Sequence, residues 1–257
     1  MHTLRRLIAI TTLAQITMLP LHAQVGEGSA ASPVPLTREG HHHLVFSNAF
    51  VRAFYVELPR GDHTLVHQHD VDYLWVGLGA AKVINASVNK PQVHLESRDA
   101  ALHFTRGGFA HAAFNEGETI YRNVTIELLQ DQGQAHNLCE AVLTEDATDC
   151  HPIVTSLVRE ASGVQISPRF ETDQIRFEIL TIDQGGQTTL RGSHTPPVIV
   201  ALNETAAALA SQLTGNETGN QGAELRDGNV MSPAPNSTAT LRNTGNTDAR
   251  FLVLEFK

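Results

Sequence analysis

Short apolar runs separated by turn-forming residues make up most of the first half of the chain. Val, Ile, Phe and Tyr dominate these runs, and little of the sequence has the periodicity of an amphipathic helix. Pro, Gly and Asn lie between the runs, where turns between strands require them. We expect strands at residues 50–58, 64–69, 73–78, 81–88, 101–104 and 120–129. Short strands at this spacing predict an all-β chain folded as a sandwich or a barrel.

The second half of the chain repeats the first. The aligned pairs are residues 46–52 with 170–176, Gly61 with Gly185, Asp99 with Asp227, Asn115 with Asn243, and residues 122–127 with 250–255. Two copies of one β-unit fit the length of the chain. We therefore expect a first barrel at residues 44–130, a linker at 131–168 and a second barrel at 169–257.

The first copy contains a cluster of histidines. His67 and His69 are two residues apart, so on a strand both side chains point to the same face of the sheet. His111 adds a third imidazole from a separate strand. Three imidazoles that converge inside a barrel can hold a transition metal and leave coordination positions open for a ligand.

Together with nearby glycines, these histidines resemble the two sequence motifs of the cupin family. The first motif is Gly, five residues, His-x-His, three or four residues, Glu, six residues, Gly; the second is Gly, five residues, Pro-x-Gly, two residues, His, three residues, Asn. The matching residues are Gly61, His67, His69 and Gly79 in the first motif, and Gly108, His111 and Asn115 in the second. The resemblance implies two double-stranded β-helix (jelly-roll) barrels in tandem, a bicupin, with one divalent metal ion per chain.

The chain departs from the two motifs at two positions. Arg106 stands where the second motif has proline, and Asp72 stands where the first has glutamate, with the loop after His69 one residue shorter. Asp72 is therefore a candidate metal ligand, either directly or through a water molecule. Alternatively, its carboxylate accepts a hydrogen bond from a metal-binding histidine and orients it.

The second copy has lost the residues that would bind metal. Arg191, Ser193 and Ala239 occupy the positions of the three histidines, and Pro196 occupies that of Asp72. His194 is one residue out of register and would face the other way. We expect the second barrel to be degenerate and free of metal, and to pack against the first.

The N-terminal residues have the composition of a secretory signal. Arg5 and Arg6 precede an apolar run at residues 7–19, which is too short and polar to span a bilayer, so we expect cleavage after residue 23. An uncleaved amphipathic anchor is the alternative. Removing residues 1–23 changes the formal charge from −9 to −9 − 2 = −11. A protein with this much negative charge is not expected to bind nucleic acid or anionic lipid. We expect it to be secreted or periplasmic, without stable insertion in a membrane.

Further expectations follow from export and from the repeat. Residues 24–43 should be flexible, and the two cysteines, Cys139 and Cys150, should form a disulfide, with two free thiols as the alternative.

The arginines that recur in both copies should pair with acids such as Glu127 and Glu255. These arginines are Arg52, Arg122, Arg176 and Arg250, and the histidines expected at the surface are His94, His103, His136 and His151.

The metal site permits several activities. Imidazole ligands suit Fe, Mn, Zn, Ni or Cu. The resemblance to cupins favours a dioxygenase-type oxidoreductase that acts on a small oxygenated substrate. An isomerase or lyase is an alternative, as is a non-catalytic bicupin that binds a small ligand or metal, because one fold carries many functions. We expect a small-molecule partner and consider a homodimer possible.

Overall fold

Strands that pair antiparallel, except for β1 (Val34–Pro35) with β4 (His67–His69), form four sheets in the part of the chain that the structure describes. The structure is a computed structural model and describes residues 32–137, 158–160, 163–191, 194–204, 207–212, 218–219 and 225–257. The predicted signal segment, residues 1–23, and both cysteines, Cys139 and Cys150, lie outside these ranges. No helix among the described residues is long and apolar enough to cross a bilayer.

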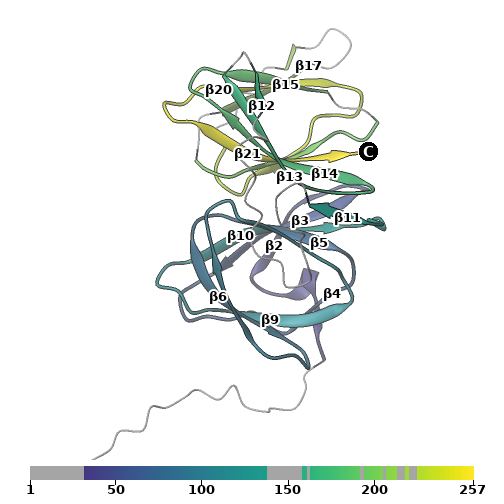
Figure 1. Cartoon of the computed structure of the whole chain (residues 1–257), viewed down its shortest axis with the longest axis vertical. Coiled ribbons are helices and arrows are strands. Elements are labelled where there is room, and N and C mark those ends of the chain that lie inside the picture. The colour runs from purple at the N-terminus through teal and green to yellow at the C-terminus, as the bar shows by residue number, and fades with distance from the viewer. Residues whose placement is uncertain are drawn as a thin grey trace, which may run out of the picture. The chain divides into compact units, whose positions relative to one another are not determined.

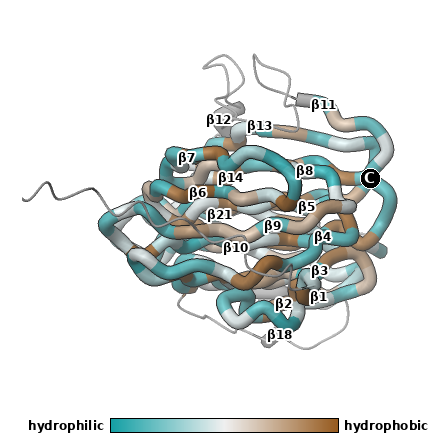
Figure 2. Tube along the Cα trace, turned by 90° about the horizontal axis from the view of Figure 1, so that it is seen from below, coloured by the Kyte–Doolittle hydropathy of each residue, from teal (hydrophilic) through white to brown (hydrophobic). Residues whose placement is uncertain are grey.

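The first barrel consists of two five-stranded sheets, drawn in purple to teal in Figure 1. One sheet contains, in spatial order, β1 (Val34–Pro35), β4 (His67–His69), β9 (Phe109–Asn115), β6 (Ala81–Ser87) and β7 (Val93–Ser97). The other contains β2 (His42–Ser47), β3 (Val51–Leu58), β10 (Tyr121–Leu128), β5 (Tyr73–Gly77) and β8 (Leu102–Thr105). Apolar and polar residues alternate along many of these strands (Figure 2).

The barrel starts at Val34, within the segment that we expected to be flexible. Val34 pairs in parallel with His67, and the short 3-10 helix η1 (Leu36–Arg38) follows directly. Leu36 and Glu39 are both 3% exposed. The expectation failed for residues 34–43 because buried contacts with β4 fix this segment, and its Pro- and Gly-bearing composition did not reveal them.

The second barrel, green to yellow in Figure 1, repeats the architecture of the first. Its larger sheet contains β11 (Ala135–Asn137), β13 (Val164–Thr172), β14 (Ile175–Ile182), β21 (Ala249–Phe256), β16 (Val198–Ala201) and β19 (Val230–Met231), and β12 (Val158–Glu160) also pairs with β13. Its smaller sheet contains β15 (Gln187–Arg191), β20 (Thr238–Asn243), β17 (Ala207–Gln212) and β18 (Thr218–Gly219). Strands β11, β12 and the start of β13 fall within residues 131–168, where we expected only a linker.

Matching hydrogen bonds confirm the internal repeat. The Asn115 side-chain amide donates to the carbonyl oxygens of Leu58 and Thr119, and the Asn243 amide donates to those of Ile182 and Thr247. In the same way, Gly61 and Gly185 donate their N–H groups to the carbonyls of these two asparagines, and both glycines have φ of 74°. A positive φ of this size favours glycine. The aligned asparagines and glycines therefore build the same turn in both barrels.

Reciprocal ion pairs join the two barrels. Arg122 of the first barrel lies 2.7 Å from Asp227 of the second, and Arg250 of the second lies 2.5 Å from Asp99 of the first. Both the arginines and the aspartates are equivalent in the repeat, so the contact is self-complementary, as in a twofold-symmetric dimer. The expected pairing of Arg52 with Glu127 is confirmed, at 2.8 Å.

The other three arginines also pair with acids, as predicted, but the acids differ from Glu255. Arg176 pairs with Glu171 rather than with Glu255, and Arg122 and Arg250 use aspartates of the opposite barrel. The sequence showed that these arginines recur, but the acids they meet depend on how the two sheets face each other.

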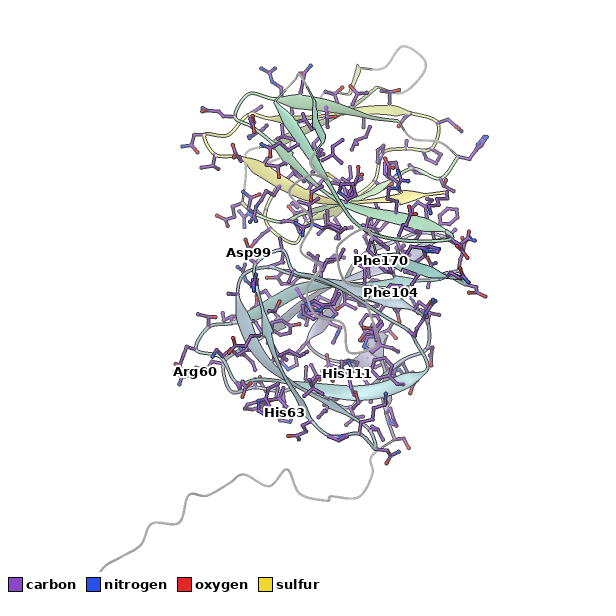
Figure 3. The ribbon with its side chains drawn as sticks, in the orientation of Figure 1. Arg60, His63, Asp99, Phe104, His111 and Phe170 are labelled. Carbon is purple, nitrogen blue, oxygen red and sulfur yellow. The ribbon has the colours of Figure 1, made fainter. Side chains whose placement is uncertain are left out.

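An apolar core continues from one barrel into the other. It contains Leu74, Val76 and Ile126 of the first barrel together with Phe177 and Leu252 of the second, all buried. Between the barrels the rings of Phe104 and Phe170 have their centroids 4.8 Å apart (Figure 3). The prediction that the second barrel buries apolar surface against the first is therefore confirmed.

Candidate metal centre

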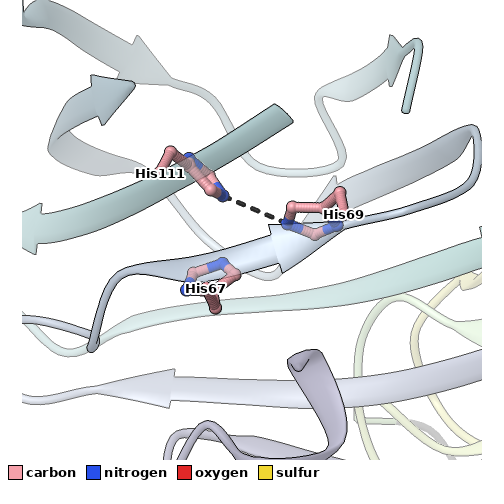
Figure 4. Close-up of side chains that lie close together, drawn as sticks. All are labelled: His67, His69 and His111. Carbon is pink, nitrogen blue, oxygen red and sulfur yellow. Dashed lines mark hydrogen bonds between the residues drawn. The ribbon is translucent and has the colours of Figure 1, made fainter. Parts of the chain in front are cut away.

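The pairing of β4 with β9 brings the three predicted histidines together. His67 lies directly opposite His111 in the antiparallel register, and His69 lies two residues further along β4 on the same face. One ring nitrogen from each of the three histidines lies within 4.8 Å of the others (Figure 4). His67 and His69 are each 1% exposed. The strand spacing therefore predicted this cluster correctly.

Hydrogen bonds fix the orientation of two of these rings. Nδ1 of His67 donates to the Leu65 carbonyl at 2.9 Å, and Nδ1 of His111 donates to Oδ1 of Asn85 at 2.7 Å. Each ring then directs the lone pair of Nε2 toward the cluster, where Nε2 of His111 lies 3.1 Å from Nε2 of His69. Nε2 of His67 is buried with no hydrogen-bond partner. Buried polar atoms normally have partners, so this arrangement fits a bound metal ion.

Burial keeps the three imidazoles neutral. It lowers the pKa of His67 to about 4. It also lowers the pKa of His69 and of His111, and in both cases neighbouring histidines add to the effect. A histidine must be unprotonated to bind a metal ion. The cluster is therefore in its ligating form at neutral pH.

Two glycines place His111 opposite β4. Any side chain at Gly107 would overlap the backbone of Val71, and Gly108 has φ of 89°. The N–H of Gly108 donates to the carbonyl of His69 at 2.7 Å, which starts the pairing of the two strands. Gly107 and the motif glycine Gly108 therefore position the strand that carries His111.

The cluster opens onto a cavity of about 650 Å³ inside the first barrel. Its lining is mainly aromatic and uncharged polar: it includes His42, Thr64, Tyr73, Trp75, Asn85, His103, Phe109, Tyr121, Asn123 and Thr125. Burial raises the pKa of the Tyr73 and Tyr121 phenols, so both remain neutral hydroxyls. Such a lining suits a small molecule with an apolar or aromatic body and a few polar groups.

One cavity residue, His103, was predicted at the surface and is instead buried. Its ring stacks on Trp75, with centroids 4.0 Å apart and planes 14° apart. The two residues are directly opposite each other on β8 and β5. The sequence shows neither this pairing nor the side of the sheet that it faces.

Comparison with known proteins identifies the fold. No protein-family model and no curated protein matches the sequence. Among solved structures, AerE from Microcystis aeruginosa has a TM-score of 0.57 at 12% identity, and the match covers 88% of this chain and 98% of AerE. A vicilin from Capsicum annuum has a TM-score of 0.57 at 9% identity, over 79% of this chain and 75% of its own. An oxalate decarboxylase has a TM-score of 0.56 at 10% identity, over 80% of this chain and 68% of its own.

Both the vicilins and oxalate decarboxylase are bicupins. The chain has the bicupin fold. At these identities the likeness concerns the fold alone. The histidine cluster adds that the first barrel of this chain has three side chains that could hold a metal ion.

Asp72 is not part of the histidine cluster of this bicupin. Its carboxylate accepts a hydrogen bond from Nη1 of Arg106 at 2.6 Å and another from the N–H of Gly107 at 3.0 Å. Arg106 and Asp72, the two residues that differ from the cupin motifs, therefore bind each other. Asp72 stabilises the glycine turn before β9 and leaves three neutral ligands at the cluster.

In the second barrel, apolar packing occupies the position of the cluster. Ala239, which aligns with His111, is 0% exposed, and the neighbouring core contains Leu180, Ile182 and Leu241. His194 is exposed. The repeated frame is thus present in both barrels of this bicupin, and the histidine cluster belongs to the first.

Sequence reasoning missed two residues beside the cluster. Glu39 and His42 form a buried hydrogen-bonded pair with 2.6 Å between Oε2 and Nδ1, and the centroid of the His42 ring lies 4.7 Å from that of His67. Both residues belong to the segment that we expected to be flexible. The spacing of Glu39 and His42 at i and i+3 was a local signal for a pair, but only the fold shows that the pair faces the cavity.

Proposed function

We propose that this protein is a metal-dependent bicupin oxidoreductase of the dioxygenase type, which acts on a small oxygenated molecule in its first barrel. The observation that carries the proposal is a set of three buried, neutral imidazoles that open onto a cavity of about 650 Å³. A metal ion in this position would supply an open coordination site and a positive charge for an oxygen ligand.

Each part of the site has a separate role in this proposal. His67, His69 and His111 hold the ion, while Asn85 and the Leu65 carbonyl orient two of the rings. Since Asp72 is held by Arg106, the ligand set has no formal charge, and the full charge of the ion remains to attract an anionic oxygen. Imidazole ligands favour Fe, Zn, Ni or Cu over the harder ions.

We also propose that the chain is exported. This proposal is supported by residues 1–23, where basic residues precede an apolar run, and by the acidic composition of the rest of the chain. Export would place Cys139 and Cys150 in an oxidising compartment where a disulfide is stable. Mass spectrometry of protein recovered from outside the cytoplasm would test both points: the expected mass lacks residues 1–23 and two hydrogens, and an intact N-terminus would contradict the proposal.

Elemental analysis tests the metal site. We expect about one first-row transition ion per chain in the wild type, and a loss of at least tenfold in metal affinity for His67→Ala, His69→Ala and His111→Ala, because each variant removes one of only three ligands. His63→Ala and His194→Ala are matched controls, because both residues are exposed and lie outside the cluster. Full metal content in all three cluster variants would refute the proposal.

Dioxygen uptake tests the reaction class. We expect iron-loaded protein to consume dioxygen with a phenolic substrate, and the cluster variants to consume none. Tight binding without turnover would instead establish a non-catalytic binding bicupin. Conversion of the substrate without dioxygen consumption would establish an isomerase or lyase.

A further inference from the structure

A buried acid–histidine pair lies beside the metal cluster and is not one of its ligands. The side chains of Glu39 and His42 are 1% and 6% exposed, and His42 lines the cavity. His42 is not among the residues whose nitrogens lie within 4.8 Å of one another in the cluster. The pair therefore needs a role other than holding the ion.

The carboxylate of Glu39 is fixed from three sides. It accepts hydrogen bonds from the N–H of His41 at 2.9 Å, the N–H of Leu65 at 3.1 Å and Nδ1 of His42 at 2.6 Å. Burial by itself would raise the pKa of Glu39, but the hydrogen bond from His42 and the two backbone donors lower it to about 2. The carboxylate is thus ionised and only accepts hydrogen bonds, so Nδ1 of His42 must carry the hydrogen.

The orientation of the His42 ring follows from this contact. The tautomer that has its one ring hydrogen on Nδ1 has its lone pair on Nε2, at the far side from Glu39. The ring lies against His67, with centroids 4.7 Å apart, on the lining of the cavity. The two backbone N–H groups would stabilise the Glu39 carboxylate even without His42. A purely structural role, in which Glu39 holds η1 against the barrel, therefore does not explain why an imidazole is present at this position.

We propose that His42 is a ligand-binding residue whose Nε2 accepts a hydrogen bond from a hydroxyl group of the molecule bound at the metal, and that Glu39 is the positioning residue that holds the ring. The inference rests on the proposed function and extends it to a substrate class. The molecule carries two neighbouring oxygens: one binds the metal, and the other keeps its hydrogen and donates it to His42. Catechols and α-hydroxy ketones have this arrangement.

Cobalt(II)-loaded protein, titrated with catechol and with its monomethyl ether, tests the inference. The ether keeps one phenolic oxygen for the metal but cannot donate from the second. The visible absorption of cobalt reports both metal occupancy and ligand binding. The variants are His42→Phe and Glu39→Gln, and the control is His43→Gln, which changes an exposed neighbour on the same strand.

We expect His42→Phe to keep its cobalt and to bind catechol about tenfold to a hundredfold more weakly, as for a buried hydroxyl left without its hydrogen-bond partner. Binding of the ether should change by less than about threefold, which is within the range of an indirect effect. Glu39→Gln should weaken catechol binding less than His42→Phe, because the ring remains but is held less firmly. His43→Gln should behave as the wild type.

Two results would overturn the inference and leave the proposed function intact. One is equal weakening of catechol and ether binding in His42→Phe, or no weakening of either. The other is cobalt loss from folded His42→Phe protein, which would make His42 a support of the metal. A wild-type protein that binds no cobalt would instead refute the proposed function, and the inference with it.

Discussion

Replacing Phe170 with alanine should destabilise both barrels together. Phe170 is 1% exposed and starts the second half of the repeat, yet its ring packs 4.8 Å from that of Phe104 in the first barrel. On its other side it stacks 5.6 Å from Phe177. Because the apolar core is continuous across the two barrels, a hole at this position removes contacts from both.

The expected loss is large for a single substitution. Truncating a buried phenylalanine to alanine costs about 3–5 kcal/mol, which combines the lost transfer free energy with that of the cavity left behind. In chains of roughly 150–250 residues, each kcal/mol lowers Tm by about 2–4 °C. We therefore expect the Tm of Phe170→Ala to fall by about 6–20 °C.

Calorimetry combined with circular dichroism would measure this effect. Phe114→Ala is the matched control, because Phe114 is 36% exposed and the same atoms are removed; its Tm should change by less than about 3 °C. A fall of Tm in one unfolding transition supports a shared core. Two separated transitions, with the first barrel unaffected, would refute the reasoning and show that the barrels are independent modules.

Two further predictions concern the turn that positions His111. Asp72→Asn should keep its metal and lose about 1–3 kcal/mol of stability, because the substitution weakens charged hydrogen bonds to Arg106 and Gly107; metal loss measured by elemental analysis would show that Asp72 is a ligand. Gly107→Ala should lose about 1–3 kcal/mol or more and also bind metal more weakly, because its methyl group overlaps the Val71 backbone. Gly40→Ala, which has nothing within 4 Å, is the control, and equal denaturation midpoints for both alanine variants would contradict the overlap.

The sequence was sufficient for features that depend on local spacing. His67 and His69 share a face because strands have a period of two residues, and the structure confirms this. The repeat predicted two barrels because equivalent asparagines and glycines build the same turns. In each case, nearby residues along the chain determine the geometry, so the pattern of the sequence contains the answer.

Features that depend on distant contacts could not be predicted. Spacing placed Asp72 near the cluster, but only the loop before β9 shows that Arg106 binds its carboxylate. His42 reaches the cavity because the N-terminal segment pairs with β4, which no local pattern indicates. His103 is buried because β8 pairs with β5 in a particular register. Each of these features depends on which distant residue or strand becomes the partner, and the residues nearby in the sequence do not determine that.

The two barrels serve as internal controls for each other. Asn115 and Asn243 make the same hydrogen bonds, and Arg122 and Arg250 make equivalent ion pairs, so these residues maintain the frame in both halves. The frame of the second barrel forms with a buried alanine in the place of His111. The frame therefore does not need the histidines.

Burying an imidazole without a hydrogen-bond partner for one of its nitrogens costs free energy, since water would otherwise satisfy that atom. Nε2 of His67 carries this cost in the first barrel. The equivalent barrel folds without it, so fold stability gives no reason for the cluster. A bound metal ion would return the lost interaction, and the ion pair between Asp72 and Arg106 then leaves that ion its full charge for the molecule that enters the cavity.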